Sequence, residues 1–368
     1  MKEQRIYLPG LNGLRAIAAL SVVISHISLT GIADFGLPML HELPLAGYGV
    51  TLFFVISGFL ITYLLINEIK KTNTVDISKF YIRRILRIWP IYYLFIFISV
   101  LVFIFLNKVE QILTPELWYY VFFAANLPFI TQNGILILIH YWSIGVEEQF
   151  YLFWPWVTRF SGNKILKAAI IILIVLFATK LFFWLTMGSS SLGYRFFMVT
   201  RFHCMMIGAI GAILYSSSNL SFISLAGNKV IQLISWILFF TMGLGIFHVP
   251  AVIGQELIAV ASLSMILGQV LNKNKFINLE KKAFDFIGKI SYGIYVIHPL
   301  IILLLSHFYK SIEINVFLKY ILVYSSVLVS TVLISWLSYT YFEKPFLNLK
   351  SKYMVVKSSN SMLSKTVS

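Results

Sequence analysis

The sequence predicts an all-α fold, a polytopic integral membrane bundle of about ten transmembrane helices with the N- and C-termini in the cytoplasm. Three observations predict it. Of the 368 residues, 59% are hydrophobic and only 12% are charged, and the mean hydropathy is +0.86. Long apolar stretches recur along the chain, and lysines and arginines gather in alternate connections between them. This composition excludes a soluble globular protein, which would need far more polar surface.

The apolar stretches have the length of membrane spans, roughly 17 to 25 residues each. We predict spans at 12–32, 47–67, 89–107, 141–159, 165–187, 197–216, 230–249, 251–271, 287–308 and 318–341. The segment Leu117–Ile130 is predicted to be re-entrant or interfacial. Residues 1–346 are predicted to form one membrane domain, and the polar, serine-rich residues 347–368 a disordered cytoplasmic tail. No cleavable signal sequence is expected, because the first apolar stretch lacks a clear small-residue cleavage site.

The net charge of +15 does not indicate nucleic-acid binding, since the basic residues lie between apolar spans and form no compact basic domain. The pattern is typical of cytoplasmic anchoring. The single cysteine, Cys204, excludes an internal disulfide and a CxxC metal or redox motif. No zinc-ligand set, P-loop or dinucleotide fingerprint occurs, so no metal is expected.

The first span carries two ionisable residues, Arg15 and His26. Such residues are costly inside a membrane and indicate a functional site. Eleven residues at about 100° each bring the two side chains to within roughly 20° of one another, about 16 Å apart along the helix. We predict that one helix face carries Arg15 near its cytoplasmic end and His26, a candidate general base, near its outer end. A buried packing histidine is the alternative interpretation.

The segment 80–90 contains Arg83, Arg84 and Arg87, whose spacing places them on one helical sector at the cytoplasmic membrane surface. Arginine favours bidentate recognition of phosphate, so these three residues are candidate phosphate ligands. Topology anchoring or binding to acidic lipids is the alternative. In the second span, Ser57 and Gly58 permit close helix approach.

The segment 140–155 brings Glu147, Glu148 and Gln149 into an apolar helix. If that span begins outside near Tyr141, Glu147 lies about 9 Å in, at the level of His26. A carboxylate on the far nitrogen of His26 would fix its tautomer and stabilise the imidazolium. The alternative is a helix-packing hydrogen bond from Glu147 or Gln149.

Four further side chains are candidates for the substrate site. They are Trp142, Ser143, Gln149 and His298. The last precedes a proline within a predicted span, and it is as readily structural as site-lining.

Short motifs occur in a characteristic order. They are Leu11–Leu20 with His26, Phe53–Leu60, Tyr81–Pro90, Trp142–Tyr151, Ser291–Pro299 and Tyr341–Pro345. Together they resemble the membrane-bound acyltransferase-3 family of bacterial O-acyltransferases, over residues 11 to about 346. The resemblance implies transfer of an acyl group, commonly acetyl, from cytoplasmic acyl-CoA to a hydroxyl of an extracytoplasmic sugar. By it, His26 would be the essential histidine.

The resemblance also implies that Arg15, Arg83, Arg84 and Arg87 lie on the CoA side, and Glu147 matches the family's acidic position. Two departures from the family pattern matter. Asn12 stands where many members have aspartate, so it has no carboxylate role. The sequence also has no C-terminal esterase-like domain like that of the longer members, so any second transfer step would be absent or supplied by another protein.

The sequence therefore predicts an acyl-CoA-dependent O-acyltransferase of the bacterial cytoplasmic membrane, with Glu147 orienting the His26 ring. The donor is acyl-CoA, most commonly acetyl-CoA. Its partners are the bilayer and an extracytoplasmic glycan or lipid-linked sugar, and no nucleic acid. Acceptor identity, acyl length and oligomeric state stay open. The alternative is a transporter or exporter of a lipid-linked or acylated saccharide, although no two similar halves are visible.

Overall fold

The computed structural model describes residues 6–28, 34–37, 43–271 and 275–356, and its secondary structure is helical. By length and composition, this part of the chain holds seven helices able to cross a membrane, or eight if one bent pair counts as a span. The predicted all-α, multi-pass membrane fold is confirmed. The sidedness of the termini stays a prediction.

The elements follow one another with short connections. They are α1 (Leu11–Ile27), α2 (Leu45–Thr72), α3 (Ile77–Phe105), α4 (Leu117–Val121), α5 (Asn126–Ile130), α6 (Tyr141–Ser161), α7 (Ile165–Met187), α8 (Leu192–Thr200), α9 (Phe202–Ser216), α10 (Leu220–Ala226), α11 (Lys229–Gly243), α12 (Ala251–Leu271), α13 (Lys282–Lys289), α14 (Ser291–Tyr309), α15 (Val316–Ser338) and α16 (Lys344–Ser351).

The number of spans differs from the predicted ten for identifiable reasons. Helix α1 has 17 residues and ends at Ile27, short of the predicted limit, and residues 29–33 lie outside the described part. Helices α6 and α7 count together as one stretch of 47 residues. At 1.5 Å per residue this is about 70 Å, enough for two crossings of about 30 Å. Helices α10 and α11 are bent by 55° at their junction.

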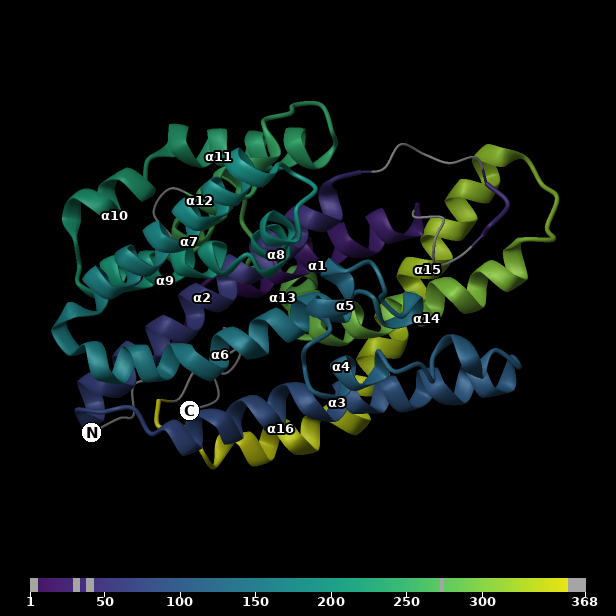
Figure 1. Ribbon diagram of the computed structural model, residues 1–368, viewed down its shortest axis with the longest axis horizontal. Helices are drawn as coiled ribbons and strands as arrows, with labels where there is room; N and C mark the ends of the chain where they lie inside the picture. Colours follow the sequence, from purple (N-terminus) through teal and green to yellow (C-terminus); the bar gives the residue numbers. More distant parts are fainter. Residues whose placement is uncertain (1–5, 29–33, 38–42, 272–274, 357–368) are drawn as a thin grey trace.

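Helices α1, α2 and α6 run through the middle of the bundle, between α7–α12 on one side and α3 with α16 on the other (Figure 1). Helix α2 packs against α1, α9 and α12. A Cβ atom at Gly58 would overlap the Met205 carbonyl of α9, and one at Gly208 would overlap the Val55 carbonyl of α2. The predicted close helix approach at Gly58 is therefore found, and only glycine permits it.

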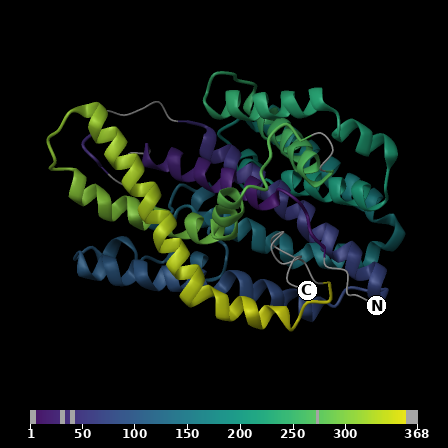
Figure 2. The same ribbon diagram turned by 180° about the vertical axis from the view of Figure 1, so that it is seen from behind.

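Helix α15 crosses the back of the bundle and continues through a π-helical turn, Tyr339–Glu343, into α16, which packs along α3 (Figure 2). Residues 347–351 of the predicted tail are thus helical, and residues 357–368 lie outside the described part. The predicted re-entrant or interfacial segment forms the two short helices α4 and α5.

Candidate active site

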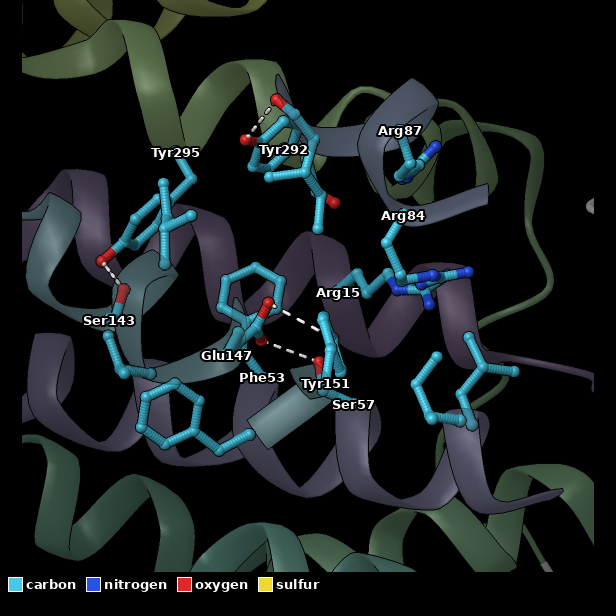
Figure 3. A pocket seen from close by; sticks show the side chains of 17 residues that line it. Arg15, Phe53, Ser57, Arg84, Arg87, Ser143, Glu147, Tyr151, Tyr292 and Tyr295 are labelled. Carbon is cyan, nitrogen blue, oxygen red and sulfur yellow. Dashed lines mark hydrogen bonds between the residues drawn. The ribbon is translucent and has the colours of Figure 1, made fainter. Parts of the chain in front are cut away.

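A cavity of about 110 Å³ lies inside the bundle, where α2, α6 and α14 supply most of its lining (Figure 3). Helix α3 contributes Arg84, Arg87 and Ile88, and α1 contributes Arg15 alone. A buried water needs only about 10–15 Å³ of such volume, so this space accepts a larger group. The three arginines stand at one end, and Ser143 hydrogen-bonded to Tyr295 stands at the other, with Glu147 between them.

The arginines at the first end have few internal partners. Arg15 Nη1 donates to Asn12 Oδ1 at 3.2 Å. The Arg84 guanidinium lies 5.6 Å from the Tyr151 ring centre, and its Nε is buried without a hydrogen-bond partner among the described residues. None of Arg15, Arg84 and Arg87 forms an ion pair with a described carboxylate. This end of the cavity therefore presents three guanidinium groups without a direct ion pair, with the Glu147 carboxylate within electrostatic range of Arg15 and Arg84.

Arg83 does not join this group. Its Nη2 lies 3.0 Å from Glu68 Oε2, and its Nη1 donates to the Tyr353 carbonyl at 3.0 Å. One residue along a helix is a rotation of about 100°, which turns Arg83 away from the sector of Arg84. The structure thus brings together three of the four arginines predicted for one site, and a carboxylate already balances the fourth.

The middle of the cavity is built around Glu147. Its carboxylate accepts a hydrogen bond from Ser57 Oγ at 2.7 Å and a long one from the Tyr151 hydroxyl at 3.5 Å. Arg15 and Arg84 lie within electrostatic range of it. The predicted contact of Glu147 with His26 is not found, because these hydroxyl groups hold the carboxylate and a different residue holds the imidazole.

That residue is His298, whose Nε2 lies 2.8 Å from Nδ1 of His26, with the ring centres 5.0 Å apart and the ring planes inclined by 29°. His298 is fully buried, and its own Nδ1 lies 2.8 Å from the Tyr295 carbonyl. Pro299 explains this contact. It has no backbone N–H, so the carbonyl four residues earlier, that of Tyr295, loses its helical partner and becomes free to accept from His298.

The cavity does not follow the Arg15–His26 face of α1 that the sequence suggests. Between these residues Ala19 and Val22 are fully buried in side-chain packing. Gly49 of α2 lets the Ala18 carbonyl and the Val22 side chain of α1 approach closely, which leaves no room along that face. The space runs instead along α2, α6 and α14 and ends at Tyr295, whose backbone carbonyl holds His298.

Two of the remaining candidates lie outside the cavity. The side-chain amide of Gln149 on α6 is used in packing, since it pairs with Asn126 of α5 at 2.7 Å and donates to the Phe123 carbonyl at 3.1 Å. Trp142 stacks on Phe129, with ring centres 5.2 Å apart, and lies 5.2 Å from the Arg201 guanidinium. Of the four candidates for the substrate site, only Ser143 lines the cavity, beside Tyr295.

Comparison with known proteins identifies the family. Residues 8–340 match the family model described as the acyltransferase domain of acyltransferase-3 proteins. The chain belongs to the acyltransferase-3 family. The match covers far more than half of the chain and includes every residue of the cavity. An acyltransferase family favours an enzyme over the transporter considered from the sequence.

Among other members of the acyltransferase-3 family, O-acetyltransferase OatA of Staphylococcus aureus strain NCTC 8325 is 30% identical over 92% of this chain and 57% of its own length. Proteins of strains MRSA252 and COL, provisionally named O-acetyltransferases, are each 29% identical over 95% and 92% of the chain. The chain spans about three fifths of the length of these relatives. No solved structure matches the chain.

A second buried polar group within this acyltransferase-3 chain was not predicted. Lys180 of α7 is fully buried, and its Nζ lies 2.8 Å from Glu256 Oε1 of α12. Nε2 of His203, on α9, lies 3.2 Å from the same oxygen. The sequence could have indicated this group, because each of the three residues is ionisable and lies inside a predicted span. The same criterion identified Arg15 and His26.

Proposed function

We propose that this acyltransferase-3 chain is a membrane O-acetyltransferase, which moves an acetyl group from acetyl-CoA on the cytoplasmic side to a hydroxyl of an extracytoplasmic glycan. One observation carries the proposal. A single cavity connects three arginines that lack carboxylate partners with Tyr295, whose carbonyl holds His298 against His26. The cationic end suits a phosphorylated donor, while His26 and His298 are not part of the lining and connect to the other end through the Tyr295 carbonyl.

The arginine end is proposed to bind the phosphates of CoA. Arg15, Arg84 and Arg87 present guanidinium groups whose geometry suits phosphate oxygens, and none of them makes a direct ion pair with a described carboxylate. The pantetheine arm would then extend along α2 and α6. Glu147 is placed to accept from an amide N–H of that arm, which gives it a donor-binding role in place of the predicted contact with His26.

His26 is proposed as the general base. It removes the proton of the acceptor hydroxyl while the hydroxyl oxygen attacks the thioester carbonyl carbon. The carbon–sulfur bond then breaks, and the imidazolium returns the proton to the departing CoA sulfur. The products are the O-acetyl ester and free CoA. A transient acetyl-histidine on the same residue is the alternative route, and it yields the same products.

The test uses membranes that contain the full chain, incubated with radiolabelled acetyl-CoA, with label followed in alkali-labile glycan esters and free CoA measured. We expect His26→Ala to abolish both products. Glu147→Gln should raise KM for acetyl-CoA and leave kcat within about tenfold of the parent value, because it acts in binding. Full activity of His26→Ala would overturn the proposal, and saccharide flux without CoA release would favour a transporter.

A further inference from the structure

We propose that His298 is the positioning residue of His26: it fixes the imidazole as the Nδ1–H tautomer and thereby makes Nε2 the basic nitrogen. The catalytic meaning of this proposal rests on the proposed function. The tautomer itself follows from hydrogen-bond partners alone and can be measured separately.

The first step concerns the proton on His298. Its Nδ1 lies 2.8 Å from the Tyr295 carbonyl and 3.2 Å from the Ile294 carbonyl. A carbonyl oxygen can only accept, so Nδ1 of His298 carries the hydrogen. Because Pro299 leaves the Tyr295 carbonyl without a helical donor, losing this contact would leave a buried acceptor unpaired. The sequence His-Pro within the helix therefore fixes the tautomer of His298.

The second step transfers this constraint to His26. A neutral imidazole with hydrogen on Nδ1 has a lone pair on Nε2. Nε2 of His298 lies 2.8 Å from Nδ1 of His26, so the latter must donate. A charged His298 is disfavoured, because the residue is fully buried, the His140 ring lies 5.3 Å away, and no described carboxylate contacts it.

The third step concerns the nitrogen that remains. With its hydrogen on Nδ1, His26 has a lone pair on Nε2, which has no hydrogen-bond partner among the described residues. When this nitrogen takes a proton, the Nδ1–H bond to His298 persists and orients the imidazolium. His298 thus orients the base His26, as the carboxylate of a catalytic triad orients its histidine. Here the orienting group is a neutral acceptor and not a carboxylate.

The variants His298→Gln and His298→Leu separate positioning from packing. A glutamine carbonyl can accept from His26 Nδ1, whereas leucine fills the space and accepts nothing. We expect His298→Leu to lower kcat by about 10²- to 10⁴-fold with KM for acetyl-CoA unchanged, by analogy with the loss of an orienting group. His298→Gln should recover at least tenfold of that loss, an order-of-magnitude expectation for a restored neutral acceptor. Equal kcat for the two variants, or a parent-like kcat for His298→Leu, would overturn the proposal.

A matched control lies on the same helix. His307 also has its Nδ1 close to the carbonyl four residues earlier, that of Leu303, at 2.9 Å, but it is exposed and contacts no second histidine among the described residues. His307→Leu should keep the parent kcat. If His307→Leu lowered kcat as much as His298→Leu, any substitution of a histidine hydrogen-bonded to the α14 backbone would impair the helix. That result would contradict the positioning role of His298.

Nitrogen-15 NMR of the histidine-labelled protein in membranes reads the tautomer without enzymatic activity. The His26 signals are assigned by their absence in His26→Ala. We expect hydrogen on Nδ1 and none on Nε2 in the parent chain, and hydrogen on Nε2 would overturn the proposal. A parent chain with the expected tautomer but no acetyl transfer would refute the proposed function and leave the tautomer assignment standing.

Discussion

Two groups of ionisable side chains in the described bundle differ in how their charges are balanced. In the group formed by Lys180, His203 and Glu256, a carboxylate meets a lysine at 2.8 Å and a histidine at 3.2 Å. In the cavity, Arg15, Arg84 and Arg87 have no carboxylate ion-pair partner within the described chain. Both groups would be costly in a membrane. Only the second group leaves its guanidinium groups without a direct ion pair in the described chain, with room beside them for an anion.

The difference suggests a structural role for the first group and a ligand-binding role for the second. A closed ion pair between α7 and α12 joins two helices and presents no net charge to a ligand. An arginine cluster without direct ion pairs at the end of a cavity keeps guanidinium N–H groups available to an entering anion. Arg83 and Arg84 repeat the contrast one residue apart, because Glu68 balances only the first.

The largest expected effect is on folding stability, when the ion pair between Lys180 and Glu256 is broken. Lys180→Met leaves Glu256 buried without its lysine and should cost about 3–5 kcal/mol of folding free energy, seen as a lower melting temperature in detergent. The double variant Lys180→Met/Glu256→Gln should recover most of the loss, because replacing both partners of a buried pair is often near neutral. Neither variant should change KM for acetyl-CoA. A raised KM with unchanged melting temperature would place this group in the donor site.

A smaller effect, on donor binding, is expected in the cavity. Arg84→Gln and Arg87→Gln each remove one charged hydrogen-bond donor to phosphate, a loss of about 1.5–3 kcal/mol. This corresponds to a rise of about 10- to 150-fold in KM for acetyl-CoA. The melting temperature without ligand should hold, because these charges have no internal ion-pair partner to lose.

The matched control for this prediction is Arg83→Gln, which breaks the ion pair with Glu68. It should lower the melting temperature and leave KM for acetyl-CoA unchanged. Equal KM effects at Arg83 and Arg84 would contradict the distinction between balanced and unbalanced arginines.

Much of the fold could be predicted from the sequence, because hydropathy and the placement of lysine and arginine depend on the membrane alone. The helical class, the close approach at Gly58 and the grouping of Arg84 with Arg87 follow from composition and helical spacing. Helix ends and breaks, such as that between α10 and α11, depend on packing that local composition does not encode.

The cavity was only partly predictable. Spacing on α1 aligned Arg15 with His26, but the small residues between them pack against α2, and the cavity lies elsewhere. The partner of His26 comes from α14, 272 residues away, and a sequence separation of that size carries no spacing rule. The His-Pro pair at residues 298 and 299 was the sequence feature that could have indicated this contact. Proline leaves a backbone carbonyl without its helical donor, and a histidine N–H can donate to that carbonyl.

The most direct test of the central claim asks whether acetyl-CoA occupies the whole cavity, from the arginines to Tyr295. Ser143→Cys places a thiol at the far end, in a background where the buried Cys204 is replaced by alanine. At about ten times Kd, acetyl-CoA should slow maleimide labelling of this thiol by about tenfold. Labelling of Ser190→Cys, at an exposed position outside the cavity, should not change. Unchanged labelling of Ser143→Cys while acetyl-CoA is bound would contradict the claim that the cavity is the donor site.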